Sequence, residues 1–500
     1  MDKKKKKKLV LDFLKVICLL YIPISIAIGI VFPHTLYYLI VIFIADMLYL
    51  AIWIDPPPER INETLKNIIP NIEKLNIFTL NYPGYRFVDI YNAVNLYLNE
   101  SQQTIERIDS YHSADLSAAI KGKFYNDKDG ITNKSESIHF DIAPNKQAII
   151  PIDIFWTFLD LNEKTNNRLI RIRYFQNLST AKVEIACKDN VTFEILKSKI
   201  ELHFLEKSIF KNQTILMNYR NDNLEDDGYE LISEKSNFSF LNTEKKIKDS
   251  EIIIDEKIKK ILKTNIFDLF SDRELFEKKG INLNRGLLFY GQPGTGKTYT
   301  SRYILDNLEN VTKIVVSGKA LTKIEHVFNI ARKLQPSLVI IEDVDLVFSD
   351  RSINQDGSML AELFDQLDGF KKNDSVVSIL TTNSIERVEK GIKNRPGRIS
   401  QCIHFDLPNS ELRKKYINSY LSGCETKELN LHQLSEKLAG ATQSFIKELI
   451  QRAKQYSIQK NIGSNQISMT NAIFEEALDE MVSYSNHHTE NIIGYRNEIL

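Results

Sequence analysis

Apolar residues fill two stretches near the start of the chain, residues 16–32 and 36–54, and almost no polar alternation interrupts them. Each stretch has about the length that a helix needs to cross ~30 Å of hydrocarbon at ~1.5 Å per residue. A buried soluble hairpin would alternate polar and apolar faces, and a cleaved signal peptide needs only one apolar stretch. The pattern therefore predicts a transmembrane helical hairpin over residues 16–55.

Positive charges flank this hairpin but are absent from its turn. Six consecutive lysines lie in the tail formed by residues 1–15, and Arg60 and Lys66 follow the second stretch. By the positive-inside rule, both ends lie on the cytoplasmic side or on the equivalent side of the mitochondrial inner membrane, the matrix. We expect an integral membrane protein whose remaining residues face that compartment.

The pattern between residues 56 and 240 has two parts. It is mainly helical to about residue 125, and short β-branched and aromatic runs follow from about 137 to 235. This predicts an α+β middle domain without a catalytic constellation. Such a domain could contact a partner or could only space the next domain from the membrane.

Strand-like and helical segments alternate after residue 240. The strand-like segments through Pro408 read "EIIID", "GLLFY", "KIVVS", "SLVII" and "SVVSILTTN". This order predicts an α/β subdomain over residues 241–408, with a mainly parallel sheet covered by helices on both faces. Residues 409–500 have a helical pattern and are expected to form a lid and a C-terminal tail.

Composition and cysteine spacing argue against a nucleic-acid partner and against a cysteine metal site. Lysine plus arginine and aspartate plus glutamate both number 65, so no charge excess indicates a nucleic acid, which we regard as an unlikely partner. The four cysteines lack the spacing of a metal site.

A phosphate-binding loop lies in "LLFYGQPGTGKTYT". It satisfies G-x-x-x-x-G-K-[ST] and stands between a strand-like and a helix-compatible run. Its glycines let backbone amides approach phosphates, Lys297 supplies a cation, and the Thr298 hydroxyl suits Mg²⁺. The residues expected to hold ATP are Gly291, Pro293, Gly294, Thr295, Gly296, Lys297, Thr298 and Tyr299.

Three later motifs extend this site. "SLVIIEDVD" ends in Glu342 and Asp343, which would bring carboxylates to the magnesium edge of the nucleotide, although acids at a strand end can also serve only as caps. "SILTTN" ends in Asn383, which could orient the attacking water. "NRPGRIS" presents Arg395 and Arg398 on a turn, where they could stabilise charge on a neighbouring subunit's γ-phosphate.

The order of these motifs over residues 248–480 resembles the AAA family of ATPases, part of the AAA+ superfamily. The resemblance implies a homo-oligomeric ring, a hexamer or a nearby number, with ATP and Mg²⁺ bound between subunits. It assigns Glu342 to the metal together with Thr298, Asp343 to the water as base, and Asn383 to sensing the γ-phosphate. Arg395 and Arg398 become the fingers that complete the next subunit's site.

The sequence departs from the family at several points. The acids stand in the order Glu342-Asp343 instead of Asp-Glu, Ser400 replaces a frequent aspartate, and "GKALTKIEHV" lacks the aromatic pore loop that grips a threaded polypeptide. Within the family, the membrane anchor and the "IEDVD" strand are similar to the membrane-anchored mitochondrial translocase of the Rieske protein and its plant and bacterial relatives.

These features predict a membrane-anchored ATPase that remodels or translocates an unidentified protein substrate near the bilayer. The alternative is an ATP-binding switch or scaffold with little turnover, because the inverted acids leave the base one methylene shorter.

Overall fold

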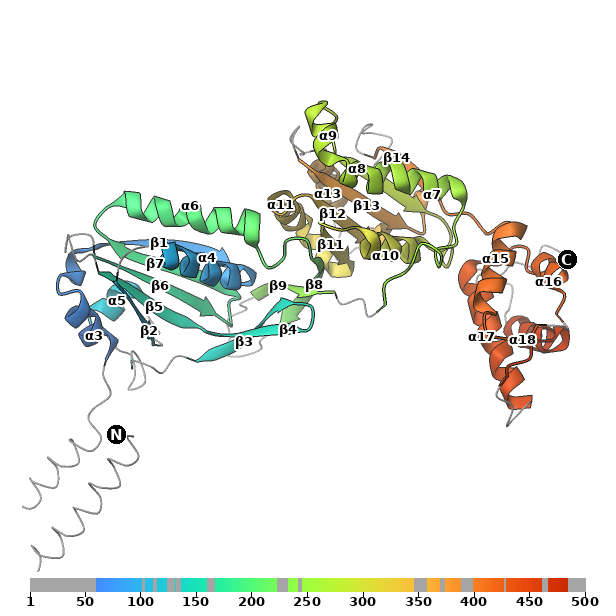
Figure 1. Ribbon diagram of the computed structural model, residues 1–500, viewed down its shortest axis with the longest axis horizontal. Coiled ribbons are helices and arrows are strands. Elements are labelled where there is room, and N and C mark those ends of the chain that lie inside the picture. The colour runs from blue at the N-terminus through green and yellow to red at the C-terminus, as the bar shows by residue number, and fades with distance from the viewer. Residues whose placement is uncertain are drawn as a thin grey trace, which may run out of the picture.

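The computed structural model describes residues 60–100, 104–110, 115–123, 131, 136–159, 167–222, 233–241, 245–345, 358–368, 374–386, 388, 399–426, 429–460 and 466–483. The predicted hairpin over residues 16–55 and the basic tail lie outside them. Among the helices of these ranges, none is long and apolar enough to cross a membrane. Figure 1 shows the middle domain, the α/β core and the helical lid arranged in a row.

The middle domain is built on an antiparallel sheet with the strand order β1–β7–β6–β5–β2. The strands are β1 (Asn76–Pro83), β2 (Thr104–Asp109), β5 (Asp153–Leu159), β6 (Arg168–Phe175) and β7 (Thr180–Cys187), and β3 (Ser137–Ala143) pairs separately with β4 (Lys146–Pro151). The helices are α3 (Ile61–Ile68), α4 (Phe87–Glu100), α5 (Leu116–Ile120) and α6 (Asn190–Lys207), with short turns η1 (Ile72–Lys74) and η2 (Gly84–Arg86).

Helices cover both faces of this sheet. Phe158 and Ile172 pack with α4 and α6 on one face, whereas Phe155 and Leu169 pack with α3 and α5 on the other. Because both sides of the central strand β5 are covered, β5 reads "DIFWTFL", an almost continuous apolar run.

A buried ion cluster links three strands of the sheet. Arg171 donates from Nε and Nη2 to the two carboxylate oxygens of Asp153, at 2.8 and 2.7 Å, and from Nη1 to Glu184 at 3.3 Å. Glu184 also accepts a hydrogen bond of 3.1 Å from the backbone N–H of Leu116, the first residue of α5. These three charged side chains are 0 to 2% exposed, so they satisfy one another inside the domain.

The helical and strand-rich halves predicted for this domain are mixed in the structure. β1 and β2 lie within the part expected to be mainly helical, and α6 lies within the strand-rich part. The helical period of α6 is blurred because Val191 and Leu202 are exposed while Phe193 and Ile200 are buried, so apolar residues occupy opposite faces.

The α/β core is a sheet with the order β14–β10–β13–β12–β11–β8–β9. The strands are β8 (Thr214–Asp222), β9 (Ser233–Phe240), β10 (Arg285–Tyr290), β11 (Thr312–Ser317), β12 (Ser337–Glu342), β13 (Val376–Thr382) and β14 (Gln401–His404). The helical elements are α7 (Glu256–Leu262), η4 (Lys263–Phe267), α8 (Asp268–Ser271), α9 (Arg273–Lys278), α10 (Lys297–Asn307), η5 (Gly318–Lys323), α11 (Ile324–Lys333) and α13 (Ser358–Asp368).

The predicted parallel sheet covered on both faces is confirmed. β10 to β14 pair in parallel. Alternate residues of β12 point to opposite faces: Leu338 and Ile340 pack in the cluster that contains residues of α7 and α10, and Val339 and Ile341 pack with α11 and α13.

β8 and β9 extend this sheet from the middle domain. β8 pairs in parallel with β11, from Thr214 beside Lys313 to Met217 beside Val316, and β9 pairs with β8 in an antiparallel manner. The sheet therefore crosses the division that the sequence analysis places between residues 240 and 241. Continuous backbone pairing makes the hairpin part of the α/β core.

One predicted strand is wrong. "EIIID", residues 251–255, is irregular backbone, because α7 begins at once after it and the Asp255 side chain caps that helix by accepting from the N–H of Lys257 at 2.7 Å. The Ile253 carbonyl accepts a hydrogen bond of 2.6 Å from the hydroxyl of Tyr416 in the lid.

The lid has the helices predicted for it. They are α15 (Ser410–Tyr420), α16 (Leu431–Lys437), α17 (Gln443–Lys460) and α18 (Asn471–Ser483), packed around their own apolar cluster.

Candidate nucleotide-binding site

The phosphate loop joins β10 to α10 and depends on glycine at three positions. Gly291, Gly294 and Gly296 have φ angles of 151°, 80° and 100°, which residues other than glycine rarely adopt. A Cβ atom at Gly291 would also lie 2.2 Å from the carbonyl oxygen of Phe405. The loop therefore keeps its backbone close to neighbouring atoms and presents its amides at the start of α10.

Lys297 is held within this loop. Its side chain is 5% exposed, and Nζ donates to the carbonyl oxygens of Gly291 and Gln292 at 2.8 and 2.9 Å. Burial lowers the pKa of Lys297 to about 8, and the negative charges of Asp343 and Asp345 partly oppose this shift. The ammonium group is thus desolvated, and its hydrogen-bond acceptors within the described part of the chain are the neutral carbonyl oxygens of the loop.

The two acids lie at the end of β12, where Glu342 is the last residue of the strand and Asp343 follows it. Burial, and then the neighbouring charge of Asp343, raise the pKa of Glu342. Asp343 has a left-handed backbone with φ of 49°, and its N–H donates to Oγ1 of Thr381 at 2.9 Å. The end of β12 thus turns sharply toward the end of β13.

Asn383 follows β13 and lies beside Asp343. Its Nδ2 donates to Oδ1 of Asp343 at 3.4 Å, a long contact. Asp345, 6% exposed, accepts hydrogen bonds from the Thr382 hydroxyl at 2.9 Å and from the backbone N–H of Asn383 at 3.1 Å. Asp345, Thr381 and Thr382 are not among the predicted site residues, although "DVD" and "TTN" place polar side chains at two adjacent strand ends.

A cavity of ≈ 680 Å³ lies between the phosphate loop and the lid. Eight of the predicted site residues line this cavity: Pro293, Gly294, Gly296, Lys297, Thr298, Tyr299, Asp343 and Asn383. Gly291, Thr295 and Glu342 do not line it. Thr295 donates within the loop to the carbonyl oxygen of Gln292 at 2.8 Å.

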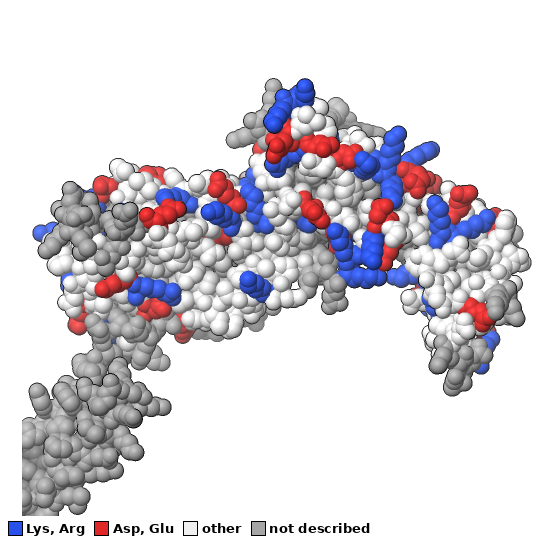
Figure 2. Space-filling model, viewed as in Figure 1, with Lys and Arg blue, Asp and Glu red and all other residues white. Residues whose placement is uncertain are grey.

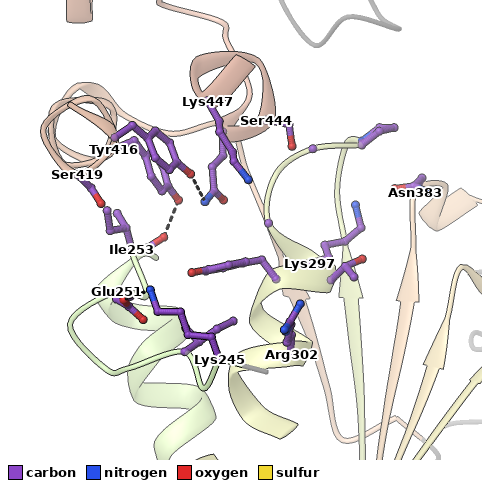
Figure 3. A pocket seen from close by; sticks show the side chains of 18 of the residues that line it. Lys245, Glu251, Ile253, Lys297, Arg302, Asn383, Tyr416, Ser419, Ser444 and Lys447 are labelled. Atoms are coloured by element: carbon purple, nitrogen blue, oxygen red, sulfur yellow. Dashed lines mark hydrogen bonds and ion pairs between the residues drawn. The ribbon is translucent and has the colours of Figure 1, made fainter. Parts of the chain in front are cut away.

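The lid supplies lining residues that the sequence analysis did not identify. Tyr416 and Tyr420 come from α15, and Gln443 from α17 donates to the Tyr420 hydroxyl at 3.2 Å. Figure 3 shows Tyr416 and Lys447 on the lid side of the cavity and Lys297 and Asn383 on the other. No motif indicates these lid residues, because only folding brings them opposite the loop.

The lid also touches the phosphate loop directly. The N–H of Ser444, in the first turn of α17, donates to the carbonyl oxygen of Gly294 at 3.1 Å. A Cβ atom at Gly294 would lie 3.0 Å from Cβ of Ser444, and one at Gly296 would lie 2.6 Å from Oε1 of Gln443. Glycines of the loop therefore serve lid packing as well as the loop conformation.

The electrostatic character of the cavity is cationic. Lys245, Lys246, Arg302 and Lys447 line it in addition to Lys297, against the acids Glu251 and Asp343. Figure 2 shows lysine and arginine side chains, mixed with acidic ones, along the junction between the α/β core and the lid. The cavity is suited to a polyanion. Arg395 and Arg398 lie outside the described residues and remain predictions.

Comparison with known proteins identifies the domain. Residues 287–407 match the ATPase family associated with various cellular activities (AAA). The chain is 28% identical over 292 residues to the ATP-dependent zinc metalloprotease FtsH 2 of Thermoanaerobacter sp. (strain X514), covering 55% of this chain and 54% of that protein. It is 29% identical over 227 residues to the 26S proteasome regulatory subunit 8 homolog of Schizosaccharomyces pombe, covering 42% of this chain and 55% of that protein.

These matches cover less than two thirds of either relative. The given sequence contains no H-E-x-x-H zinc motif. The match to the family covers the phosphate loop, Glu342, Asp343 and Asn383. Asp343, Asn383 and most of the loop line the cavity, and Glu342 precedes Asp343 at the end of β12. Residues 287–407 of this chain therefore form an ATPase domain of the AAA family.

Proposed function

We propose that this chain binds ATP with Mg²⁺ beneath its lid and hydrolyses it. The observation that carries the proposal is the convergence of the phosphate loop, the Asp343 carboxylate and the Asn383 amide on one cavity. Its ≈ 680 Å³ lies within the range of ordinary ligand pockets.

Binding would use the backbone and Lys297 for the phosphates. The amides at the start of α10 favour anions, and Lys297 Nζ can exchange two neutral carbonyl acceptors for charged phosphate oxygens. The aromatic rings of Tyr416 and Tyr420 suit the base on the lid side. Closure of the lid over the nucleotide would also strengthen these charge interactions by excluding water.

Thr298 and Glu342 fit Mg²⁺ in their chemistry. Both offer oxygen atoms, which Mg²⁺ prefers, and a bound cation would offset the cost of keeping the Glu342 and Asp343 charges side by side. When bound, Mg²⁺ would neutralise phosphate charge that develops during phosphoryl transfer.

Hydrolysis would use Asp343 and Asn383. Asp343 would polarise the attacking water by accepting its proton in a hydrogen bond, and Asn383 would fix the position of that water and of the Asp343 carboxylate. Arg395 and Arg398 of one subunit would stabilise the γ-phosphate bound to the next, so that turnover requires a homo-oligomeric ring of about six subunits.

The use of the energy is inferred from the whole chain. The apolar hairpin over residues 16–55 would anchor the ring to a membrane, with the ATPase domain on the cytoplasmic or matrix side. The relatives are named as an ATP-dependent protease and as proteasome regulatory subunits, which supports a protein substrate. Remodelling or translocation of a protein near the bilayer fits these features.

The inverted acids support a second candidate function, an ATP-binding switch or scaffold. Replacing Asp343 with Asn separates the two candidates, because Asn keeps the shape of the side chain and cannot act as a base. In the ATPase, the variant binds ATP normally in a fluorescence titration and loses turnover by ~10²-fold or more. Equal turnover in the variant and the parent protein would contradict hydrolysis through Asp343.

A further inference from the structure

Asp343 combines an unusual residue order with an unusual backbone. Its φ of 49° places it in the left-handed region, which costs most residues free energy and which Asp and Asn tolerate better than residues with longer side chains. Among the described non-glycine residues at the strand ends of this site, Asp343 alone has a positive φ. The backbone thus disfavours Glu at this position.

One hydrogen bond stabilises the left-handed backbone of Asp343. The N–H of Asp343 donates to Oγ1 of Thr381 at 2.9 Å, across the gap between the ends of β12 and β13. Thr381 is fully buried and lies two residues before Asn383, on the strand that also positions that amide. Without the Thr381 hydroxyl, the backbone N–H of Asp343 would lose the hydrogen-bond acceptor that the described residues give it.

We propose that Thr381 is a positioning residue for ATP hydrolysis, because its hydroxyl holds the left-handed backbone that directs the Asp343 carboxylate into the cavity. The order Glu342-Asp343 is then an adaptation to this backbone and does not weaken the base. This inference rests on the proposed function, since it assumes that Asp343 acts on the attacking water.

The substitution of Asp343 by Glu tests whether side-chain length or backbone conformation limits the rate of hydrolysis. If side-chain length limited the reaction, the longer Glu would equal or exceed the parent protein. If the backbone sets the position, Asp343→Glu loses about tenfold or more in kcat, because the longer side chain overreaches the water from the same left-handed turn or forces the turn to change.

Thr381→Val removes the acceptor at nearly constant volume. We expect about a tenfold loss of kcat, the size of one hydrogen bond, with KM for ATP changed less than twofold. Thr381→Ser keeps the hydroxyl and should retain at least half of the parent kcat. In the Asp343→Glu background, Thr381→Val should cause little further loss, because both changes act on one turn.

Ser378→Ala is the matched control. Ser378 lies on the same strand, is fully buried, and its hydroxyl has no hydrogen-bond partner in the described part of the chain. The control should keep kcat, KM and the thermal midpoint. If Thr381→Val lost activity only because the protein unfolds, its thermal unfolding midpoint would fall and its loss of ATP turnover would increase with temperature. That result would overturn the positioning role.

The outcomes separate this inference from the proposed function. In one outcome, Asp343→Asn loses the parent activity, whereas Asp343→Glu and Thr381→Val keep it. This result would leave the proposed ATPase function intact and overturn the role of Thr381. Parent activity that is also unchanged in Asp343→Asn would contradict the proposed function itself and the present inference with it. Low kcat in Asp343→Glu and Thr381→Val, with rescue by Thr381→Ser, would support the role of Thr381.

Discussion

Lys297 is a buried cation whose present hydrogen-bond partners are uncharged. Because burial lowers its pKa to about 8, the unbound protein loses this charge as the pH rises through 8. Bound phosphate would favour the protonated form and raise the pKa again. Nucleotide binding and proton uptake are therefore linked at this residue.

We predict that the affinity for ATP falls above pH 8, by up to about tenfold per pH unit, because only the protonated Lys297 pairs with phosphate. Below pH 7 the affinity should not depend on this group. Calorimetry at pH 8.5 in two buffers of different ionisation enthalpy measures the proton uptake, with Lys447→Met as a control that removes another cation of the cavity. A flat affinity from pH 7 to 9.5, without proton uptake, would show that Lys297 does not supply this charge.

At the scale of elements, the sheets determine which residues meet. The ends of β12 and β13 lie side by side because these strands pair in parallel, and this places Asp343 next to Asn383. In the middle domain, antiparallel pairing sets Arg171 directly opposite Glu184 and places Asp153 two residues along β5 from Phe155, which lies opposite Arg171. Both sites are products of strand register.

The ion cluster of the middle domain should be costly to break. Arg171→Met leaves two buried carboxylates without their guanidinium group, and we expect a loss of about 3–5 kcal/mol in the stability of that domain. Urea unfolding followed by tryptophan fluorescence measures it, since Trp156 lies on β5.

The exposed pair of Arg107 and Asp109 provides the control, because Arg107→Met should change stability by less than about 1 kcal/mol. Equal shifts of the unfolding midpoint in the two variants would mean that burial does not set the cost of losing Arg171.

Local sequence predicts some of these elements better than others. The phosphate loop and the core strands of the ATPase domain were predictable, because a short motif or a continuous apolar run decides each of them. The sequence pattern places the β8–β9 hairpin in the middle domain, because its pairing partner β11 lies about a hundred residues later in the chain. α6 was missed because apolar residues on both faces hide the helical period.

The same distinction applies to the site. Lys297, Asp343 and Asn383 stand in recognisable patterns at strand ends, and the structure brings them to one cavity. Tyr416, Tyr420 and Gln443 belong to the lid and meet the loop only after folding. No side-chain pattern indicates Thr381, because its proposed role depends on the backbone angle of Asp343, at the end of the neighbouring strand.

For the whole molecule, the β8–β9 hairpin has a mechanical consequence. It is hydrogen-bonded into the ATPase sheet next to β11, and β11 leads directly to η5, where an aromatic pore loop was expected and is absent from the sequence. The lid, in contrast, meets the phosphate loop at its nucleotide side, where the Ser444 N–H donates to the Gly294 carbonyl oxygen. The middle domain should therefore move with the α/β core, and the lid should respond to nucleotide.

The central claim is ATP hydrolysis that requires assembly. The most direct measurement is ATP turnover per subunit of the detergent-solubilised full chain as a function of protein concentration, beside Asp343→Asn and mixtures of the parent protein with Arg398→Ala. We predict a specific rate that rises steeply with concentration, vanishes in Asp343→Asn, and falls more than in proportion to the fraction of Arg398→Ala subunits. A rate that stays at background in every sample, while ATP still binds, would contradict hydrolysis and leave an ATP-binding switch.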